Sequence, residues 1–171
     1  MSKPKVKKHS VFRRNIDWIM LAIFFGAAIL LTIAAYNPVI IEPDEGEILV
    51  YKRANCGCCQ KWVEYLEENG FKVKVSTVDS TAPIQNALNI PVNVRSCHTA
   101  LINDFWVEGH VPAKNIETLI EEADKEVAGI AVPGMPPGSP GMESDNPQPY
   151  DVLMVHYSGE VSVMTESPLV H

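Results

Sequence analysis

The stretch EILVYKRANCGCCQKWVEYLEENG, residues 47–70, decides the fold of this chain because it joins a strand pattern to a helix pattern. Its first seven residues, EILVYKR, are sufficiently apolar and β-branched at their centre to predict a buried strand. From about Cys56 to Asn69, apolar side chains recur at helical spacing, and Gly70 is suited to end the helix as a C-cap. Three of the four cysteines of the chain lie where the strand pattern changes to the helix pattern.

The segments that follow continue the alternation of strands and helices. We predict a half-buried strand in FKVKVSTV (71–78), a short helix in APIQNALNI (82–90), a hairpin of HTALI (98–102) and FWVEG (105–109) around Asn103-Asp104, and an amphipathic helix in PAKNIETLIEEADKEV (112–127). The resulting order, β-α-β-α-β-β-α, is that of a thioredoxin-like domain. We therefore predict an α/β fold in which helices flank a central sheet.

Two further segments lie beyond this order. A Pro/Gly-rich loop at residues 133–142 contains Pro-Gly-Met twice, ending at Met135 and at Met142. The segments YDVLMVHY and EVSVM flank Ser158-Gly159 and predict a hairpin at residues 150–164. We interpret this hairpin as a C-terminal extension of the thioredoxin-like domain.

The N-terminal part of the chain predicts a membrane anchor. Residues 1–17 carry six of the 14 Lys and Arg side chains but one of the 21 Asp and Glu side chains. Residues 18–36, WIMLAIFFGAAILLTIAAY, contain no charge and are about as long as a membrane crossing requires. The positive-inside rule would keep the basic tail at residues 1–17 in the cytoplasm. A cleaved signal peptide is the alternative, although its apolar region is normally shorter and ends in small residues.

These features predict a single-pass protein of the inner (cytoplasmic) membrane. Residues 18–36 would be the transmembrane anchor, residues 37–46 a linker, and residues 47–171 a thioredoxin-like metal-binding domain that faces the periplasm or the exterior. The chain after residue 17 is strongly acidic. Acidity argues against nucleic acid as a partner, because its phosphate groups would be repelled.

The cysteine cluster has three possible interpretations. Structural disulfides are the first, but adjacent Cys58 and Cys59 can hardly bridge each other without strain, and local bridges close loops too small to contribute much. Cys56 and Cys59 form a Cys-x-x-Cys pair that could be a redox-active disulfide, and a helix N-terminus stabilises thiolates. The third interpretation is a metal site, to which Cys97 and His98 add a thiolate and an imidazole.

The predicted hairpin extends this metal site. If Asn103-Asp104 is a two-residue turn, Cys97 lies opposite His110 and their side chains share a face. Met135 and Met142 could add thioethers from the Pro/Gly loop, or they could simply pack as a lid. His98 and His110 could likewise be polar residues that are satisfied near strand ends. Thiolate, imidazole and thioether donors form a soft set that suits Cu(I) and is acceptable to zinc.

The motifs CGCC..W, SCHTA, EGHVPA and AVPGMPPGSPGM, with the final hairpin, closely resemble the bacterial family called domain of unknown function 411. Its members are CopG-like metal-binding proteins linked to copper. The resemblance covers about residues 47–164 and implies a thioredoxin-like fold, export and copper handling. At matching positions it points to a metal site built from Cys56, Cys58, Cys59, Cys97, His98, His110, Met135 and Met142.

The resemblance also bears on the choice between metal binding and disulfide exchange. Thioredoxin-like folds usually place a cis-proline opposite the active Cys-x-x-Cys pair, and Cys97-His98 stands at the corresponding place here. Our hypothesis is therefore an extracytoplasmic protein that binds copper, with Cu(I) favoured, for copper tolerance or transfer. Its partners would be copper ions and other copper-handling proteins. One alternative is a thiol–disulfide or copper redox enzyme that uses Cys56 and Cys59, and a second is a zinc or iron–sulfur module.

Overall fold

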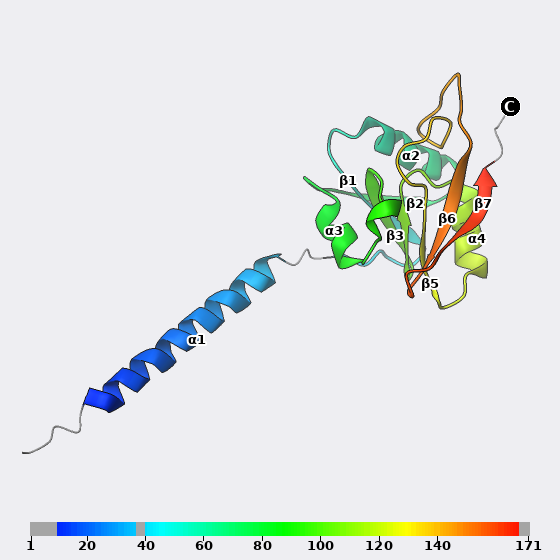
Figure 1. Cartoon of the computed structure of the whole chain (residues 1–171). Helices are drawn as coiled ribbons and strands as arrows, with labels where there is room; N and C mark the ends of the chain where they lie inside the picture. The colour runs from blue at the N-terminus through cyan, green and yellow to red at the C-terminus, as the bar shows by residue number, and fades with distance from the viewer. Residues whose placement is uncertain (1–9, 37–39, 168–171) are drawn as a thin grey trace, which may run out of the picture. The chain divides into compact units, whose positions relative to one another are not determined.

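The computed structural model of the chain describes residues 10–36 and 40–167, and the chain divides into two units, Met1–Pro38 and Val39–His171 (Figure 1). In the first unit, helix α1 (Ser10–Tyr36) begins inside the predicted basic tail. No helix in the described ranges combines the length and the apolar character that a membrane crossing requires. Residues 1–9 of the predicted tail and 37–39 of the predicted linker lie outside the described residues.

The second unit is built on a seven-stranded sheet in the order β2-β1-β3-β4-β5-β6-β7. Its strands are β1 (Glu47–Lys52), β2 (Lys72–Thr77), β3 (His98–Ile102), β4 (Phe105–Glu108), β5 (Val127–Ala131), β6 (Tyr150–His156) and β7 (Val161–Ser167). Its helices are α2 (Gly57–Glu68), α3 (Ala82–Ala87), the 3-10 helix η1 (Val92–Val94) and α4 (Ala113–Glu122). The prediction of a mixed α/β fold with a central sheet flanked by helices is confirmed.

Successive residues of the strands supply two separate cores, because side chains alternate between the faces of a sheet. Ile48 and Val50 of β1 belong to a core that contains Trp62 and Leu66 of α2 together with residues of α4. Leu49 and Tyr51 belong to the other core, which contains Ile84 of α3 and neighbouring apolar residues. The sheet therefore lies between α2 and α4 on one face and α3 on the other.

Helix α2 follows the predicted pattern closely. Its buried residues are Cys59, Trp62, Val63 and Leu66, which form the apolar stripe that faces the sheet. The helix begins after Cys56, whose sulfur caps it by accepting a hydrogen bond from the backbone N–H of Cys59. It ends before Gly70, which has the positive φ of +87° that favours glycine.

The sequence pattern does not reveal strand β5, and the predicted helix at residues 112–127 is too long. Helix α4 ends at Glu122, and β5 begins at Val127 and runs parallel to β4. All five residues of β5 are buried, so the segment shows no alternation of polar and apolar side chains that would identify a strand. Gly129 permits the close packing, because a Cβ at this position would overlap the backbone oxygen and the indole ring of Trp106.

The C-terminal hairpin is present, and β5 connects it to the main sheet. Strand β6 pairs with β5, and β7 pairs with β6 at the edge. The hairpin of β3 and β4 also forms with the predicted register, in which Thr99 pairs with Glu108 and Ile102 with Phe105. Since His98 at the start of β3 pairs with Lys52 at the end of β1, the segment before β3 lies beside the N-terminus of α2.

Candidate metal centre

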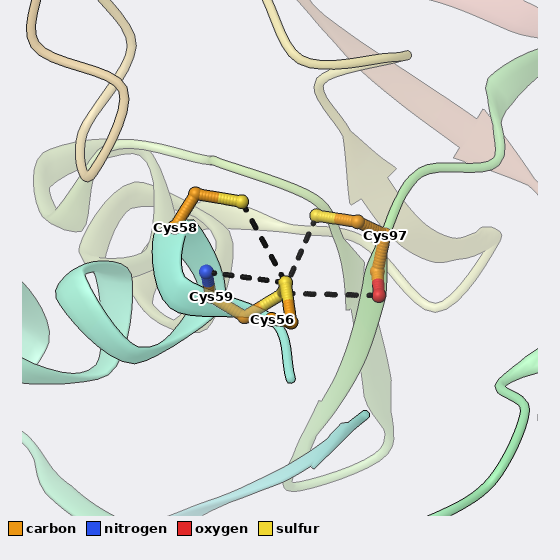
Figure 2. A group of neighbouring side chains, drawn as sticks. All are labelled: Cys56, Cys58, Cys59 and Cys97. Atoms are coloured by element: carbon orange, nitrogen blue, oxygen red, sulfur yellow. Dashed lines mark hydrogen bonds between the residues drawn. A yellow bond between two sulfur atoms is a disulfide. The ribbon is translucent and has the colours of Figure 1, made fainter. Parts of the chain in front are cut away.

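All four cysteines meet where β1 leads into α2 and where β3 begins. The disulfide Cys56–Cys59 lies in the middle of the group. The Cys58 sulfur is 3.6 Å from the Cys56 sulfur, and the Cys97 sulfur is 3.5 Å from the Cys59 sulfur. Figure 2 shows the side chains of Cys58 and Cys97 reaching toward this disulfide, one from α2 and the other from the segment before β3. The topology therefore brings together thiols that are about forty residues apart in the chain.

The imidazole rings of two histidines contact the sulfur of Cys97, which also belongs to the cysteine group. The Cys97 sulfur lies 3.3 Å from Nδ1 of His98 and 3.2 Å from Nε2 of His110. The contact with His110 follows from the register of the β3–β4 hairpin and agrees with the predicted pairing. Strand geometry alone does not predict the contact with His98, since adjacent residues of a strand normally face opposite sides.

The surroundings of His110 define its protonation state. Its Nδ1 lies 2.8 Å from the backbone oxygen of Pro140, which can only accept a hydrogen bond, so Nδ1 carries the proton. Burial lowers the pKa of His110 and favours the neutral ring. The Nε2 atom of the neutral ring therefore carries no proton, and its lone pair faces the Cys97 sulfur. This arrangement is typical of metal-binding histidines, whose second nitrogen is held by a carbonyl or a carboxylate.

His98 is fully buried between aromatic rings. Its ring centroid lies 4.3 Å from that of Trp62 and 5.0 Å from that of His110. Its Nε2 atom has no hydrogen-bond partner among the described residues. Burial first, and the neighbouring His110 second, lower the pKa of His98 to about 3, so this ring is also neutral. Trp62 is held in place by a 2.9 Å hydrogen bond from Nε1 to the backbone oxygen of Val111.

The Cys97 thiol contacts both the cysteine group and the two imidazoles, and it is hard to ionise. Burial first, and the nearby Cys58 thiol second, raise the pKa of Cys97 to about 12. Without a positive charge nearby, this sulfur stays protonated at neutral pH. A bound cation would supply that charge, because metal coordination deprotonates thiols.

The Pro/Gly loop places one of its two methionines at the cluster. The Met135 sulfur lies 4.0 Å from the Cys58 sulfur, and half of Met135 is exposed. Met142 stabilises the loop itself through its backbone, which accepts a hydrogen bond from Gly138 N–H and donates one to the Ser139 carbonyl. No hydrogen bond from the Met142 sulfur to the cysteines or histidines is present in the described part of the chain.

The geometry offers two overlapping sets of metal ligands. The sulfurs of Cys56, Cys58, Cys59 and Cys97 lie within 4.8 Å of one another, and so do the ligand atoms of Cys97, His98 and His110. The cluster could hold a metal ion once the Cys56–Cys59 disulfide is reduced. A pocket of about 440 Å³ is lined by Cys56, Cys58, Cys97 and Met135 among others, whereas Cys59 is fully buried beneath it.

Sequence reasoning did not single out two groups that the structure places at or near the site. The Pro140 carbonyl that orients His110 could not be found, because a backbone atom leaves no residue pattern. The buried Glu108 did leave a signal, since it is an acidic residue that directly follows the apolar segment Trp106–Val107 in a predicted strand.

Comparisons with known proteins agree with this description. A family model described as "Protein of unknown function, DUF411" matches residues 94–142, which include Cys97, His98, His110 and the Pro/Gly loop. Two solved structures of copper resistance protein CopG, Form 2 and Form 1, match with TM-scores of 0.69 and 0.68 and 44% sequence identity. Both cover 73% of this chain, and the matches span 100% and 99% of the solved chains. No curated protein sequence matches the chain. The resemblance stated from the motifs is confirmed, and the chain belongs to the DUF411 family.

Proposed function

We propose that this protein binds Cu(I) outside the cytoplasm and contributes to copper tolerance or copper transfer. The observation that carries the proposal is that four cysteine sulfurs form one group, of which Cys97 also contacts two neutral imidazoles, beside a pocket lined by Cys56, Cys58 and Cys97. Similarity to copper resistance protein CopG supports copper as the metal. The ligand chemistry agrees, because thiolates and thioethers are soft donors that select Cu(I).

The size of the ligand set supports more than one copper ion per chain. Four thiols, two imidazoles and the Met135 thioether exceed the roughly four ligands that one tetrahedral ion uses. A thiolate has enough lone pairs to bridge two ions, and Cys97 already lies between the two ligand groups. We therefore expect a bridged site that requires all four cysteines in the reduced state.

The strand order supports a thioredoxin-like assignment for the part of the domain that carries the site. Strands β2-β1-β3-β4 are adjacent in the sheet, β1 and β2 are parallel, and α2 begins directly after β1. In such a fold, a Cys-x-x-Cys pair at the helix N-terminus suits thiol chemistry. The β5–β7 strands are then an extension of this domain, and the Pro/Gly loop between β5 and β6 brings Met135 and the Pro140 carbonyl to the cluster.

A second candidate function is thiol–disulfide or copper redox chemistry at Cys56 and Cys59. The observation that favours it is the disulfide between these residues at the N-cap of α2. Two substrate thiols would reduce the disulfide to two cysteine thiols and become a disulfide themselves. Cys58 would have no necessary part in that exchange, which separates the two functions experimentally.

The localisation in the proposal rests on the sequence. The six basic residues before residue 15 and the uncharged segment 18–36 support an N-terminal anchor in the inner membrane, with the metal site on the far side. Other copper-handling proteins of that compartment would be the partners in copper transfer.

A Cu(I) titration of the full-length wild type and of Cys58→Ser tests the proposal. Both proteins are reduced, kept anaerobic and challenged with a competing Cu(I) chelator, while the disulfide-reduction activity is measured in parallel. Wild type should retain more than one Cu(I) per chain, and Cys58→Ser should retain less copper but still form the Cys56–Cys59 disulfide.

An oxidoreductase gives the opposite pattern. Cys58→Ser would then be nearly silent, whereas Cys56→Ser and Cys59→Ser would abolish disulfide reduction. If the wild type retains no Cu(I) and reduces disulfides efficiently, copper binding is wrong. If it retains zinc in preference to Cu(I), the zinc alternative replaces the proposal.

A further inference from the structure

A fully buried carboxylate lies behind the Cys97 segment. Glu108, the last residue of β4, has no exposed surface. Its Oε1 accepts hydrogen bonds from the backbone N–H of Ser96 and from Nε2 of Gln85, both at 2.6 Å. Its Oε2 accepts a 2.7 Å hydrogen bond from the hydroxyl of Thr99. A buried carboxylate is costly unless such donors compensate it, so its presence requires an explanation.

The donors of Glu108 hold the peptide that precedes Cys97. Glu108 binds the N–H of Ser96, and Gln85 donates to the Ser96 carbonyl at 3.3 Å. Both hydrogen-bonding groups of the Ser96 backbone are therefore held by buried side chains. The Ser96 carbonyl belongs to the planar peptide that joins it to Cys97, so holding this carbonyl also restricts the direction of the Cys97 backbone.

Glu108 also connects this segment to the one that carries His110. Its backbone oxygen accepts a 2.9 Å hydrogen bond from the Val132 N–H, and Gly109 next to it donates to the His98 carbonyl at 3.0 Å. A Cβ at Gly109 would lie 2.6 Å from the Ser96 hydroxyl, which shows how closely the two segments approach. Through the bond from the Ser96 N–H to its side chain, Glu108 therefore joins the Cys97 segment to the segment that leads to His110.

We propose that Glu108 is a positioning residue that holds the Cys97 sulfur between Cys59 and His110. The inference rests on the proposed Cu(I) site. It adds a hydrogen-bond network of Glu108, Gln85, Ser96 and Thr99. The Glu108 carboxylate itself contacts none of the proposed metal-ligand atoms. Among the described residues no salt bridge to Glu108 is present, and the direct contacts of its carboxylate are the three hydrogen bonds.

Two substitutions separate hydrogen bonding from charge. In Glu108→Gln the amide oxygen can accept from Ser96 and Gln85, while its NH₂ group donates to Thr99, whose hydroxyl can also accept. Glu108→Ala leaves all three donors unpaired. Leu119→Ala in α4 is the matched control, because Leu119 is fully buried in the other part of the core and its truncation destabilises the fold without touching the network.

The experiment compares the four full-length proteins in the reduced state at a temperature at which all are folded. Cu(I) affinity is measured by chelator competition. Amide hydrogen exchange at Ser96 and the rate of Cys97 alkylation are measured without metal. Glu108→Ala should weaken Cu(I) binding by about 10- to 100-fold, the usual effect of losing an outer-shell partner. It should also accelerate Ser96 exchange and Cys97 alkylation, and Glu108→Gln should restore all three measurements.

The inference is overturned if Glu108→Ala matches Leu119→Ala within twofold in all three measurements, or if Glu108→Gln fails to restore them. If Glu108→Ala does not fold, Gln85→Leu takes its place, since it removes the donor to the Ser96 carbonyl and should change the same measurements in the same direction. A wild type that binds no Cu(I) refutes the proposed function, while Ser96 exchange and Cys97 alkylation still decide the role of Glu108.

Discussion

At the scale of single residues, the two histidines that contact Cys97 have different roles in the structure. The ring of His110 is oriented by the Pro140 carbonyl, which leaves its Nε2 lone pair directed at the sulfur. The ring of His98 is held by packing against Trp62, and its Nε2 finds no partner in the described part of the chain. Both rings are neutral because burial makes their charged forms unfavourable.

This burial predicts a pH dependence of folding stability. The pKa of His98 is lowered from 6.5 to about 3, so His98 stabilises the folded metal-free protein fully above pH 6.5. That contribution is lost as the pH falls from 6.5 toward 3, because the unfolded chain then binds a proton that the folded chain does not. Burial also lowers the pKa of His110, which likewise reduces folding stability as the pH falls. Burial raises the pKa of Glu108, which changes the stability in the opposite direction.

The variant His98→Gln isolates the contribution of His98. As the pH falls below about 6.5, the free energy of unfolding of the wild type should decrease by up to about 1.4 kcal/mol per pH unit more than that of the variant. The two proteins are compared at about pH 7.5 and about pH 5. Urea unfolding of the reduced, metal-free proteins at both pH values measures this difference. His156→Gln, which removes a histidine on β6 outside the cluster, is the control. Equal pH dependence in wild type and His98→Gln would mean that His98 is not buried in its neutral form.

At the scale of elements, the Pro/Gly loop is the segment that closes the site over α2. Gly141 has φ of +79°, and a Cβ there would lie 2.7 Å from the backbone nitrogen of Trp62 and 2.8 Å from the backbone oxygen of Cys58. The loop therefore packs directly on the backbone of the first turns of α2. The Ser96 hydroxyl binds the other end of the loop at the Gly134 carbonyl. Pro140, whose carbonyl binds His110, directly precedes Gly141 in this packed segment.

We predict that Gly141→Ala weakens Cu(I) binding and destabilises the fold by about 1–3 kcal/mol more than Gly134→Ala. Gly134 is the matched control because it lies in the same loop, has φ of +69° and would place a Cβ in open space. The backbone strain is similar in the two variants, so the difference measures the collision with α2. Chemical denaturation and chelator competition provide the two readouts. Indistinguishable variants would show that the loop position does not influence the site.

At the scale of the whole molecule, the candidate metal site lies entirely in the second unit. Its ligands come from the start of α2, the start of β3, the end of the β3–β4 hairpin and the Pro/Gly loop. The first two of these segments meet because the end of β1 pairs with the start of β3 in the interior of the sheet. The compartment to which this unit is delivered determines whether it meets copper and which proteins it meets.

We predict that the second unit is exported and stays attached to the inner membrane. Reporter enzymes fused after Asn37 should be active only outside the cytoplasm, and the full-length protein should fractionate with membranes. The reason is the basic tail followed by the uncharged segment 18–36. Mature protein in the soluble periplasmic fraction would refute the anchor and leave the compartment unchanged. Reporter activity confined to the cytoplasm would refute both.

The sequence by itself determined the features that depend on near neighbours in the chain. Helical spacing identified α2 and the cysteines at its start, and the two-residue turn at Asn103-Asp104 defined the register that pairs Cys97 with His110. Both inferences succeed because the side-chain periods of helices and strands are local properties of the backbone.

The tertiary structure alone decided the features that depend on distant segments. Strand β5 could not be recognised, because its five residues are buried on both faces and carry no alternating pattern. The choice of Met135 over Met142 as the thioether near Cys58 depends on how the loop crosses α2. The Pro140 carbonyl and the Glu108 network likewise depend on packing across the sheet. Such contacts are set by strand order and by which groups remain to satisfy one another after burial, and spacing along the chain records neither.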